Sequence, residues 1–524
     1  MWRRLGAGCL ATAGGGLVGL SLPPLSLWPL AIVGTAVVFN LLAGRTARQR
    51  VAVGFCFGIG QFFVGLAWAL QFNSAGYVVL SLLEAAFFGL ACGLVPARRG
   101  HLAGCAGAFV LAEWAREAWP FGGLPLGGIA LSQLPGPLAG TARLGGSLLV
   151  AGVTFLAGAV LAEAATALAG YGAHRRGGPQ HRARHARRGD PGPPVRAWPS
   201  AVAGAVAVVA IAIAGTYAPD GAGATSGLIG VAVIQGGGQR GLDQLQVAPV
   251  RVLHAALRET ARLRRKTALV LWPEDVVASP GPFFGSPYER LLARLARSRH
   301  TTLLAGVTEP VGSTRFRNEI VAFGPEGNVE AVFEKVHRVP FGEYVPWRGL
   351  FKHLANLSDV PRDAIAGHGS GMIATSAGRF AVLVSYEVFF SARGRSGVRA
   401  GGTIIVVPTN TSSYSSDQEP SQEIAASRLQ AIEEGRYVLQ AAPTGYSAVI
   451  DNTGRVLKVS SLASPAILTA RVPKLEESTV YEIYGGTPVL AAAIVMVLGG
   501  WAAGLGGWAA GLGARRRRRD SGLT

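Results

Sequence analysis

The sequence predicts a polytopic α-helical membrane domain joined to an α/β domain. Hydrophobic residues make up 49% of the 524 residues and the mean hydropathy is +0.34, which is too apolar for an ordinary soluble protein. Apolar stretches long enough to cross a bilayer fill the first 220 residues and return near the C-terminus. Between them, short β-type runs alternate with helical patterns. These observations divide the chain at 1–220, 222–480 and 486–524.

We expect about eight transmembrane helices. Each candidate is a mostly apolar stretch of roughly 17–25 residues, the length that spans the hydrocarbon core. The first has no clear small-residue cleavage site and further spans follow it directly, so we interpret it as a retained helix rather than a signal peptide. The eight segments are 5–22, 26–44, 51–72, 76–97, 101–118, 146–170, 199–217 and 488–510.

Arginines mark one side of this predicted membrane domain. They lie at both chain ends and after the second, fourth and sixth spans, which is a single side if the eight helices alternate. The positive-inside rule makes that side the cytoplasm and places the α/β domain outside. The segment 171–197 is expected to be a disordered cytoplasmic loop, with nucleic-acid binding as the weaker explanation of its charge. The arginines are Arg3, Arg4, Arg45, Arg48, Arg50, Arg98, Arg99, Arg175, Arg182, Arg188 and Arg515 to Arg519.

The cysteines argue against two kinds of site. All four lie in the apolar N-terminal third, without a CxxC pair or a His-rich ligand spacing, which disfavours a zinc site or a disulfide framework. Residues 220–524 contain no thiol. We therefore expect neither a metal nor a dissociable cofactor. The four are Cys9, Cys56, Cys92 and Cys105.

The segment 222–480 is predicted to form sheets covered by helices, because strand-type and helical patterns alternate along it. Its length is sufficient to bury a full core. The strand-type runs are 228–235, 267–272, 302–307, 319–324, 380–386, 402–408 and 437–442. The helical patterns are 252–265, 287–297 and 421–436.

Polar residues follow three of these apolar runs. Glu274 comes just after the run at 267–272, where burial would raise its pKa and make it a usable general base. Taken alone, such an acid is more often an ordinary surface-loop residue. Lys335 follows a short β-type run, and an ammonium there can stabilise an oxyanion during acyl transfer. Ser385 ends the run at 380–386, at a position suited to a nucleophile.

Glu343 lies eight residues after Lys335, in a Pro-Phe-Gly-Glu-Tyr-Val-Pro turn whose two prolines restrict the backbone. We expect its carboxylate to hold the lysine in place. The next segment, WRGLFKHLANL, carries Trp347, Leu350, Phe351 and Leu354, which could share one apolar face. Either they pack against the domain, or they form a mobile arm that enters the outer leaflet and admits acyl chains.

Three motifs together resemble the apolipoprotein N-acyltransferase family, the membrane-anchored branch of the carbon–nitrogen hydrolase (nitrilase) superfamily. They are WPE, EKVHRVPFGEYVP and SYE after an apolar strand, and PFGEYVP is the most specific. The resemblance covers almost the whole chain, including VAVIQGG, the segment 113–140 and SRLQAIEEGRYVLQAAPTGYSAVID. It implies that 222–480 forms an α-β-β-α sandwich on the outer face of a bacterial plasma membrane.

The resemblance also implies a two-step acyl transfer. A nucleophile takes an acyl chain from a phospholipid, and the α-amine of a diacylglyceryl-cysteine at a lipoprotein's N-terminus then takes it as an amide. Ser385 stands where the family has its cysteine. The residues that correspond by motif are the base Glu274, the oxyanion stabiliser Lys335 and the supporting Glu343, Tyr386 and Glu387. We expect Trp347, Phe351 and Asn410 to be substrate-binding positions.

Serine is a harder nucleophile to activate than cysteine. A thiol titrates near ~8.5 and an alcohol closer to water's ~15.7. This gap of roughly 7 pKa units corresponds to on the order of 10 kcal/mol at most. Other positions also depart from the family pattern: the segment 410–415 lacks its Asn-Asp-x-Trp-Phe-Gly run, and Gly237, Pro443 and Leu126 replace an asparagine, an asparagine and a tryptophan.

These departures keep two alternatives open. One is a catalytically silent relative that binds lipid or lipoprotein, or stabilises a partner such as an active paralogue or a polyprenyl-phosphate-mannose synthase. The other is a membrane-anchored amidase that uses Ser385, which fits eight spans less well than lipid-ester chemistry.

Overall fold

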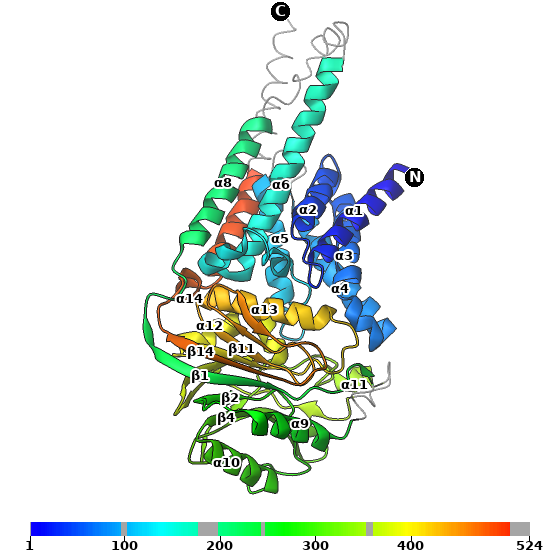
Figure 1. Ribbon diagram of the computed structural model, residues 1–524. Helices are drawn as coiled ribbons and strands as arrows, with labels where there is room; N and C mark the ends of the chain where they lie inside the picture. Colours follow the sequence, from blue (N-terminus) through cyan, green and yellow to red (C-terminus); the bar gives the residue numbers. More distant parts are fainter. Residues whose placement is uncertain (1, 96–101, 177–196, 243–246, 353–359, 503–524) are drawn as a thin grey trace, which may run out of the picture.

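A bundle of long helices stands against one face of an α/β domain in the computed structural model, which describes residues 2–95, 102–176, 197–242, 247–352 and 360–502 (Figure 1). A helix lies at each of the eight predicted spans. They are α1 (Trp2–Ser21), α2 (Pro29–Leu42), α3 (Ala47–Gly65), α4 (Ser74–Leu94), α5 (Leu102–Ala118), α6 (Ala142–Arg176), α8 (Ala197–Tyr217) and a final helix, Thr487–Ala502.

Length and composition allow three of the described helices to cross a membrane unaided, namely those over Ser74–Leu94, Ala139–Ala169 and Pro199–Tyr217. Three shorter apolar helices accompany them, at Leu5–Ser21, Pro29–Leu42 and Thr487–Ala502. Helix α6 continues to Arg176, so the first residues of the predicted loop 171–197 are helical, which corrects that prediction. Residues 177–196, Arg98, Arg99 and Arg515 to Arg519 lie outside the described residues.

Glycines explain how these helices pack so closely. A Cβ added at Gly15 would lie 1.8 Å from the Phe57 carbonyl oxygen, because α1 and α3 touch backbone to backbone there. Gly146, at φ +67°, allows the kink near the start of α6. Caps fix two helix starts: Thr46 and Gln49 form a capping box on α3, and the Asn73 side chain accepts from the Gly76 amide on α4.

The α/β domain is a four-layer α-β-β-α sandwich, as predicted. One sheet has the order β14-β1-β2-β4-β5-β6, with β3 beside β4 and β7 beside β5, and the other has the order β13-β12-β11-β10-β9-β8. The first comprises β1 (Thr225–Gln235), β2 (Leu269–Leu271), β3 (Val277–Ala278), β4 (Thr302–Val311), β5 (Arg315–Phe323), β6 (Val329–Glu334), β7 (Asp363–Ala364) and β14 (Ala466–Leu475). The second comprises β8 (Met372–Thr375), β9 (Gly378–Val382), β10 (Ile404–Pro408), β11 (Val438–Ala441), β12 (Ala448–Ile450) and β13 (Val456–Val459).

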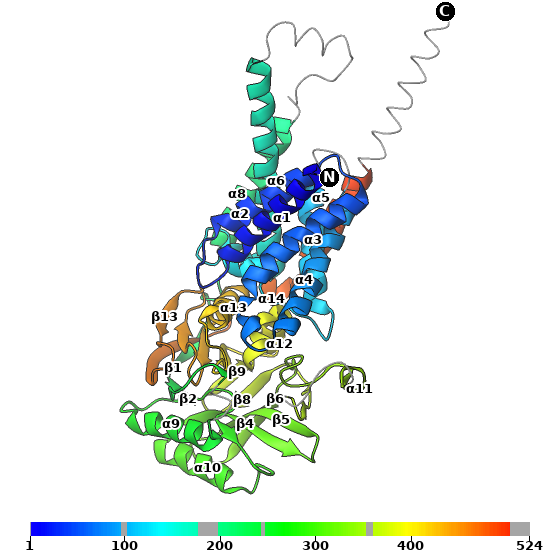
Figure 2. The same cartoon turned by 90° about the vertical axis from the view of Figure 1, so that its right-hand side faces the viewer.

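Helices cover both outer faces of the sandwich. Helices α9 (Pro249–Arg262) and α10 (Pro287–Arg299) lie on the face away from the bundle, and α12 (Ser391–Arg399) and α13 (Gln418–Glu434) lie between the second sheet and the bundle (Figures 1 and 2). Short helices complete the set: η1 (Ala67–Gln71), η2 (Ile129–Gln133), η3 (Ala139–Thr141), α11 (Arg348–Phe351), η5 (Ser385–Phe389) and α14 (Val480–Tyr484).

Strand alternation divides the core into layers. Along β9, Phe380 and Val382 point between the two sheets, while Ala381 faces the opposite side together with Leu383 just beyond the strand. That opposite side belongs to an apolar cluster that continues through α13 into the membrane helices, where it includes Phe109. The membrane bundle and the second sheet therefore share one hydrophobic core.

The predicted strand 380–386 is shorter than expected. Strand β9 ends at Val382, where its parallel pairing with β10 also ends, and Ser385 begins the 3₁₀-helix η5. Ser385 has φ +50°, a left-handed conformation that cannot continue a strand. This sharp turn takes Ser385 out of the sheet.

Candidate active site

Glu274 is held at the end of β2 by a fixed loop. The Trp272 indole Nε1 donates to the Thr260 hydroxyl at 2.9 Å on α9, which anchors the residues before it. On the neighbouring strand β4, a Cβ added at Gly306 would lie 2.4 Å from the Pro273 carbonyl oxygen, so glycine lets the loop pack against the sheet. Glu274 is only 3% exposed, which refutes the surface-loop reading.

Lys335 joins Glu274 to Glu343. Its Nζ donates to Glu274 Oε1 at 2.9 Å and to Glu343 Oε1 at 2.8 Å, and the lysine side chain is 2% exposed. The second oxygen of Glu343 accepts from the Val339 amide at 2.7 Å, which closes the Pro-Phe-Gly-Glu turn on itself. The predicted role of Glu343 in holding the lysine matches these contacts.

Asn318 on β5 is a fourth member that the sequence interpretation missed. Its side-chain Nδ2 donates to Glu274 Oε1 at 2.8 Å and to Glu343 Oε1 at 3.0 Å, while its backbone carbonyl oxygen accepts from the Lys335 backbone amide at 2.9 Å. A buried asparagine inside an apolar strand is the only local signal that could have identified it.

Burial sets the charge of this cluster. It raises the pKa of Glu274 to about 8, even though the nearby Lys335 ammonium lowers it. Burial also disfavours the lysine's charge, but Glu274 and Glu343 outweigh it and raise the pKa of Lys335 above its usual value. The site therefore holds a permanent ammonium beside a carboxyl that can take up or release a proton near neutral pH.

Glu387 connects the Ser385 turn to the lysine loop. Its Oε1 accepts from the Val336 amide at 3.0 Å and the His337 amide at 3.1 Å, directly after Lys335. Its Oε2 accepts from the Val384 amide at 2.9 Å, directly before Ser385. This one carboxylate brings the serine turn and the lysine loop together.

Several donors keep Glu387 ionised. Burial alone would raise its pKa, but the neighbouring His337, the Arg393 guanidinium and the backbone amides lower it below its ordinary value. Arg393 Nε lies 3.3 Å from Glu387 Oε1. The His337 ring stacks on that of Phe390, with ring centroids 4.3 Å apart.

A further carboxyl lies beside Glu274. Asp275 has φ +56°, and its Oδ2 accepts from the Asn410 side-chain Nδ2 at 3.3 Å. Burial, followed by the charge of Glu343, raises the pKa of Asp275 to about 6. Asn410, a predicted site residue, thus reaches the cluster through Asp275, which the sequence interpretation missed.

Exposed aromatic side chains follow the lysine loop, and we call the surface that they form the rim. Trp347 is 65% exposed and its ring lies 5.3 Å from that of Phe121, which also contacts Phe341 at 5.9 Å between ring centroids. Helix α11, which ends at Phe351, stands at one edge of the α/β domain (Figure 2). Leu354, the last member of the predicted apolar face, lies outside the described residues.

Comparisons with known proteins bear on both parts of the chain. Residues 14–160 match the model of the apolipoprotein N-acyltransferase N-terminal domain, and residues 230–480 match that of carbon–nitrogen hydrolases. The apolipoprotein N-acyltransferase of Azotobacter vinelandii is 29% identical over 94% of this chain and 94% of its own length. That of Mycolicibacterium smegmatis is 29% identical over 93% and 83%. A solved carbon–nitrogen hydrolase from Helicobacter pylori is 17% identical over 50% of this chain and 95% of its own, with a TM-score of 0.38.

Proposed function

Because the chain belongs to the apolipoprotein N-acyltransferase family, we propose that it acts on that family's substrates at a site formed by Glu274, Lys335 and Ser385. The acyl donor is a phospholipid and the acceptor is the α-amine of a diacylglyceryl-cysteine at a lipoprotein's N-terminus. One observation supports this proposal above the others: the buried Lys335 ammonium is bonded to Glu274 and Glu343, and Glu387 ties its loop to the Ser385 turn.

In the first step, the Ser385 hydroxyl attacks the carbonyl carbon of the phospholipid ester. Its proton passes to the Glu274 carboxylate, and the negative charge that develops on the carbonyl oxygen is stabilised by the Lys335 ammonium. The bond between the acyl carbon and the glycerol oxygen then breaks. Glu274 returns the proton to that oxygen, so a lysophospholipid leaves and an acyl-serine ester remains.

In the second step, the neutral α-amine of the acceptor attacks the acyl-serine ester. Glu274 takes a proton from the attacking nitrogen and delivers it to Ser385 Oγ as the ester bond breaks. The products are the amide and the free serine. Because an ester passes its acyl group to an amine more slowly than a thioester does, we expect this chain to turn over more slowly than a relative with cysteine.

The rim supplies an entry for the acyl chain. Trp347 and Phe341, with Leu350 at 56% exposure, form an apolar surface next to the site. We place this rim at the outer leaflet, with all eight helices spanning the membrane and the arginine-rich segments in the cytoplasm. Phe351, the last residue of α11, and Asn410, beside Asp275, complete the proposed substrate contacts.

A catalytically silent relative is the second candidate, and the serine hydroxyl is the observation that favours it. The buried acids and lysine would then hold the fold, while the protein binds lipid or lipoprotein or stabilises a partner such as an active paralogue.

Acyl-enzyme trapping decides between the two candidates. The purified protein is incubated in detergent with phospholipid, and the peptide carrying Ser385 is analysed by mass spectrometry. We expect an acyl-ester on Ser385 that is lost on adding a diacylated lipopeptide and is missing from Ser385→Ala. A wild-type peptide without the adduct, alongside an acylated Ser385→Cys variant, identifies the silent relative.

A further inference from the structure

Two tyrosine hydroxyls bind the same short loop of the membrane domain. Tyr386, next to Ser385, donates to the Gly123 carbonyl at 2.9 Å, and this bond is buried. Tyr344, next to Glu343, donates to the Phe121 carbonyl at 3.3 Å. The two acceptors are two residues apart in the loop 119–124, which we call the clamp loop. The serine turn and the lysine loop are thus both attached to one piece of backbone outside their own domain.

The clamp loop is itself fixed by a buried arginine on α5. Arg116 is fully buried, and its NH2 donates to the carbonyl of Leu124, the last residue of the loop, and to that of Leu126 just beyond it. Its charge is balanced by Glu84 on α4, 2.6 Å away, and by Glu113, 2.8 Å away. Three charges buried in this way hold one geometry, because moving the arginine would leave carboxylates unpaired.

The backbone of the clamp loop also has little freedom. The Gly123 amide donates to the Pro120 carbonyl at 2.8 Å, and the Leu124 amide to the Arg116 carbonyl at 2.7 Å. Gly123 has φ +107°, and a Cβ added there would lie 1.9 Å from the Glu117 carbonyl oxygen. The loop is therefore rigid enough to set a distance between the groups that bind it.

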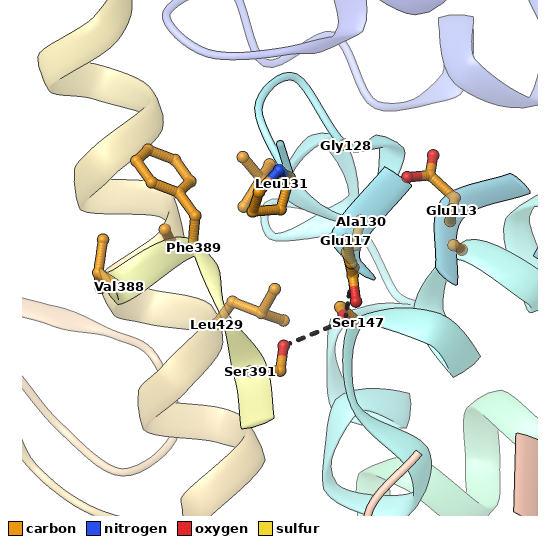
Figure 3. Close-up of a pocket in the computed structure, with 13 residues that line it drawn as sticks. Glu113, Glu117, Gly128, Ala130, Leu131, Ser147, Val388, Phe389, Ser391 and Leu429 are labelled. Atoms are coloured by element: carbon orange, nitrogen blue, oxygen red, sulfur yellow. Dashed lines mark hydrogen bonds between the residues drawn. The ribbon is translucent and has the colours of Figure 1, made fainter. Parts of the chain in front are cut away.

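Figure 3 shows a second place where the α/β domain faces the helical bundle. Glu117 of α5 lies across a small pocket from Val388 and Phe389, the residues that follow the serine turn. The Ser147 and Ser391 hydroxyls meet across this seam at 3.1 Å. The hydroxyl of Ser391, at the start of α12, thus gives the α/β domain a further attachment to the helical bundle beside the Tyr386 bond.

We propose that the clamp loop sets the position of the Ser385 turn relative to Lys335, with Tyr344, Tyr386 and Arg116 as its positioning residues. The helical bundle then contributes to the spacing between nucleophile and ammonium through this loop, in addition to the Glu387 carboxylate that joins the serine turn to the lysine loop. A shift of α4 or α5 would change that spacing through the Arg116 ion cluster.

This inference rests on the proposed function in that Ser385 is the nucleophile, and its test needs no acyl transfer. In a full-length Ser385→Cys variant, the alkylation rate of the introduced thiol by iodoacetamide is followed by mass spectrometry of its own peptide, across pH. A nearby ammonium lowers the pKa of a thiol, so the rate at neutral pH reports the spacing to Lys335. Acyl trapping on the wild-type chain tests the proposed function separately.

Tyr344→Phe and Tyr386→Phe are added to this background singly and together. We expect each to slow alkylation at pH 7 by about three- to tenfold. The pair should be little slower than either single variant, because losing one attachment already frees the spacing. Tyr77→Phe is the matched control, since it removes a hydroxyl that donates to the Phe63 carbonyl within the helical bundle. It should leave the rate unchanged.

Arg116→Lys keeps the positive charge but loses the hydrogen bonds to two backbone carbonyls, and it should slow alkylation in the same way. Thermal unfolding of each variant in detergent identifies those that are folded. The inference would be overturned if the folded Tyr344→Phe and Tyr386→Phe variants were alkylated as fast as Tyr77→Phe. It would also be overturned if the two decreases in alkylation rate simply multiplied in the double variant.

Discussion

Lys335 Nζ lies 2.9 Å from Glu274 Oε1, and both side chains are almost completely buried. A buried pair of this kind is costly to break, because the remaining charge keeps its desolvation penalty and loses its partner. The pair also determines the proton chemistry of the site, because the Glu274 carboxyl can gain or lose a proton near neutral pH while the Lys335 ammonium keeps its proton.

Removing the lysine charge should destabilise the fold. We expect Lys335→Met to lower the free energy of unfolding by about 3–5 kcal/mol, because Glu274 and Glu343 would be left buried without a cation. Thermal unfolding in detergent measures this. The exposed Lys352→Met is the control and should be neutral, and adding Glu274→Gln to Lys335→Met should recover part of the loss.

Acyl transfer should increase with pH. The base form of Glu274 is the carboxylate, and its pKa is raised to about 8, so the reactive fraction grows as pH rises through that value. We expect the rate of acyl loading, measured on Ser385→Cys for sensitivity, to rise about tenfold between pH 7 and pH 9. Glu274→Gln should remove both the rate and its pH dependence. A flat profile would contradict the assignment of Glu274 as base.

Alkaline pH should weaken the seam between the two domains through Glu433 on α13. Its Oε1 accepts from the Ser147 amide at 2.6 Å and the Ser391 hydroxyl at 2.9 Å. Burial, followed by the charge of Glu117, raises the pKa of Glu433 to about 8. The folded state thus favours the protonated form, and this contribution to stability, complete below pH ~4.5, is lost as pH rises toward about 8.

Glu433→Gln keeps the acceptor oxygen and removes the ionisation. Its free energy of unfolding, measured by thermal unfolding, should be close to that of the wild type at pH 5 and higher by about 4 kcal/mol at pH 9. The exposed Glu326→Gln serves as a control. Equal differences at the two pH values would show that folding does not raise the pKa of Glu433.

The clamp loop should tolerate alanine at one glycine and not at its neighbour. Gly122 and Gly123 both have positive φ, but only the Cβ at Gly123 would collide with the Glu117 carbonyl. We expect both Gly→Ala variants to cost about 1 kcal/mol from backbone strain, and Gly123→Ala to cost on the order of 2 kcal/mol more. Unfolding temperatures that fall equally in the two variants would argue against a tightly packed loop.

Local sequence patterns predicted the features that depend mainly on residues close together in the chain. The alternating strands and amphipathic helices of the sandwich have the predicted type, and Glu274, Lys335 and Glu343 share one cluster because each follows a strand that leads to the same edge. The predicted strand conformation at Ser385 was wrong. A run of apolar residues does not indicate at which residue a positive φ ends the strand.

The contacts missed by the sequence interpretation are those made at long range. Asn318 is separated from Glu274 by 44 positions, and Tyr386 from Gly123 by 263. Neither pairing produces a periodic pattern or a characteristic spacing in the sequence, because each depends on how the sheets and helices pack together. Strand β14 was missed for the same reason, since it gains its place by pairing antiparallel with β1 at the far end of the domain.

The apolar cluster that runs from the membrane helices through α13 to the second sheet makes the two halves one folding unit. A fragment that begins at β1 lacks the helical bundle and would expose this apolar face, including Leu429 and Ile432, to water. Such a fragment should collect in inclusion bodies.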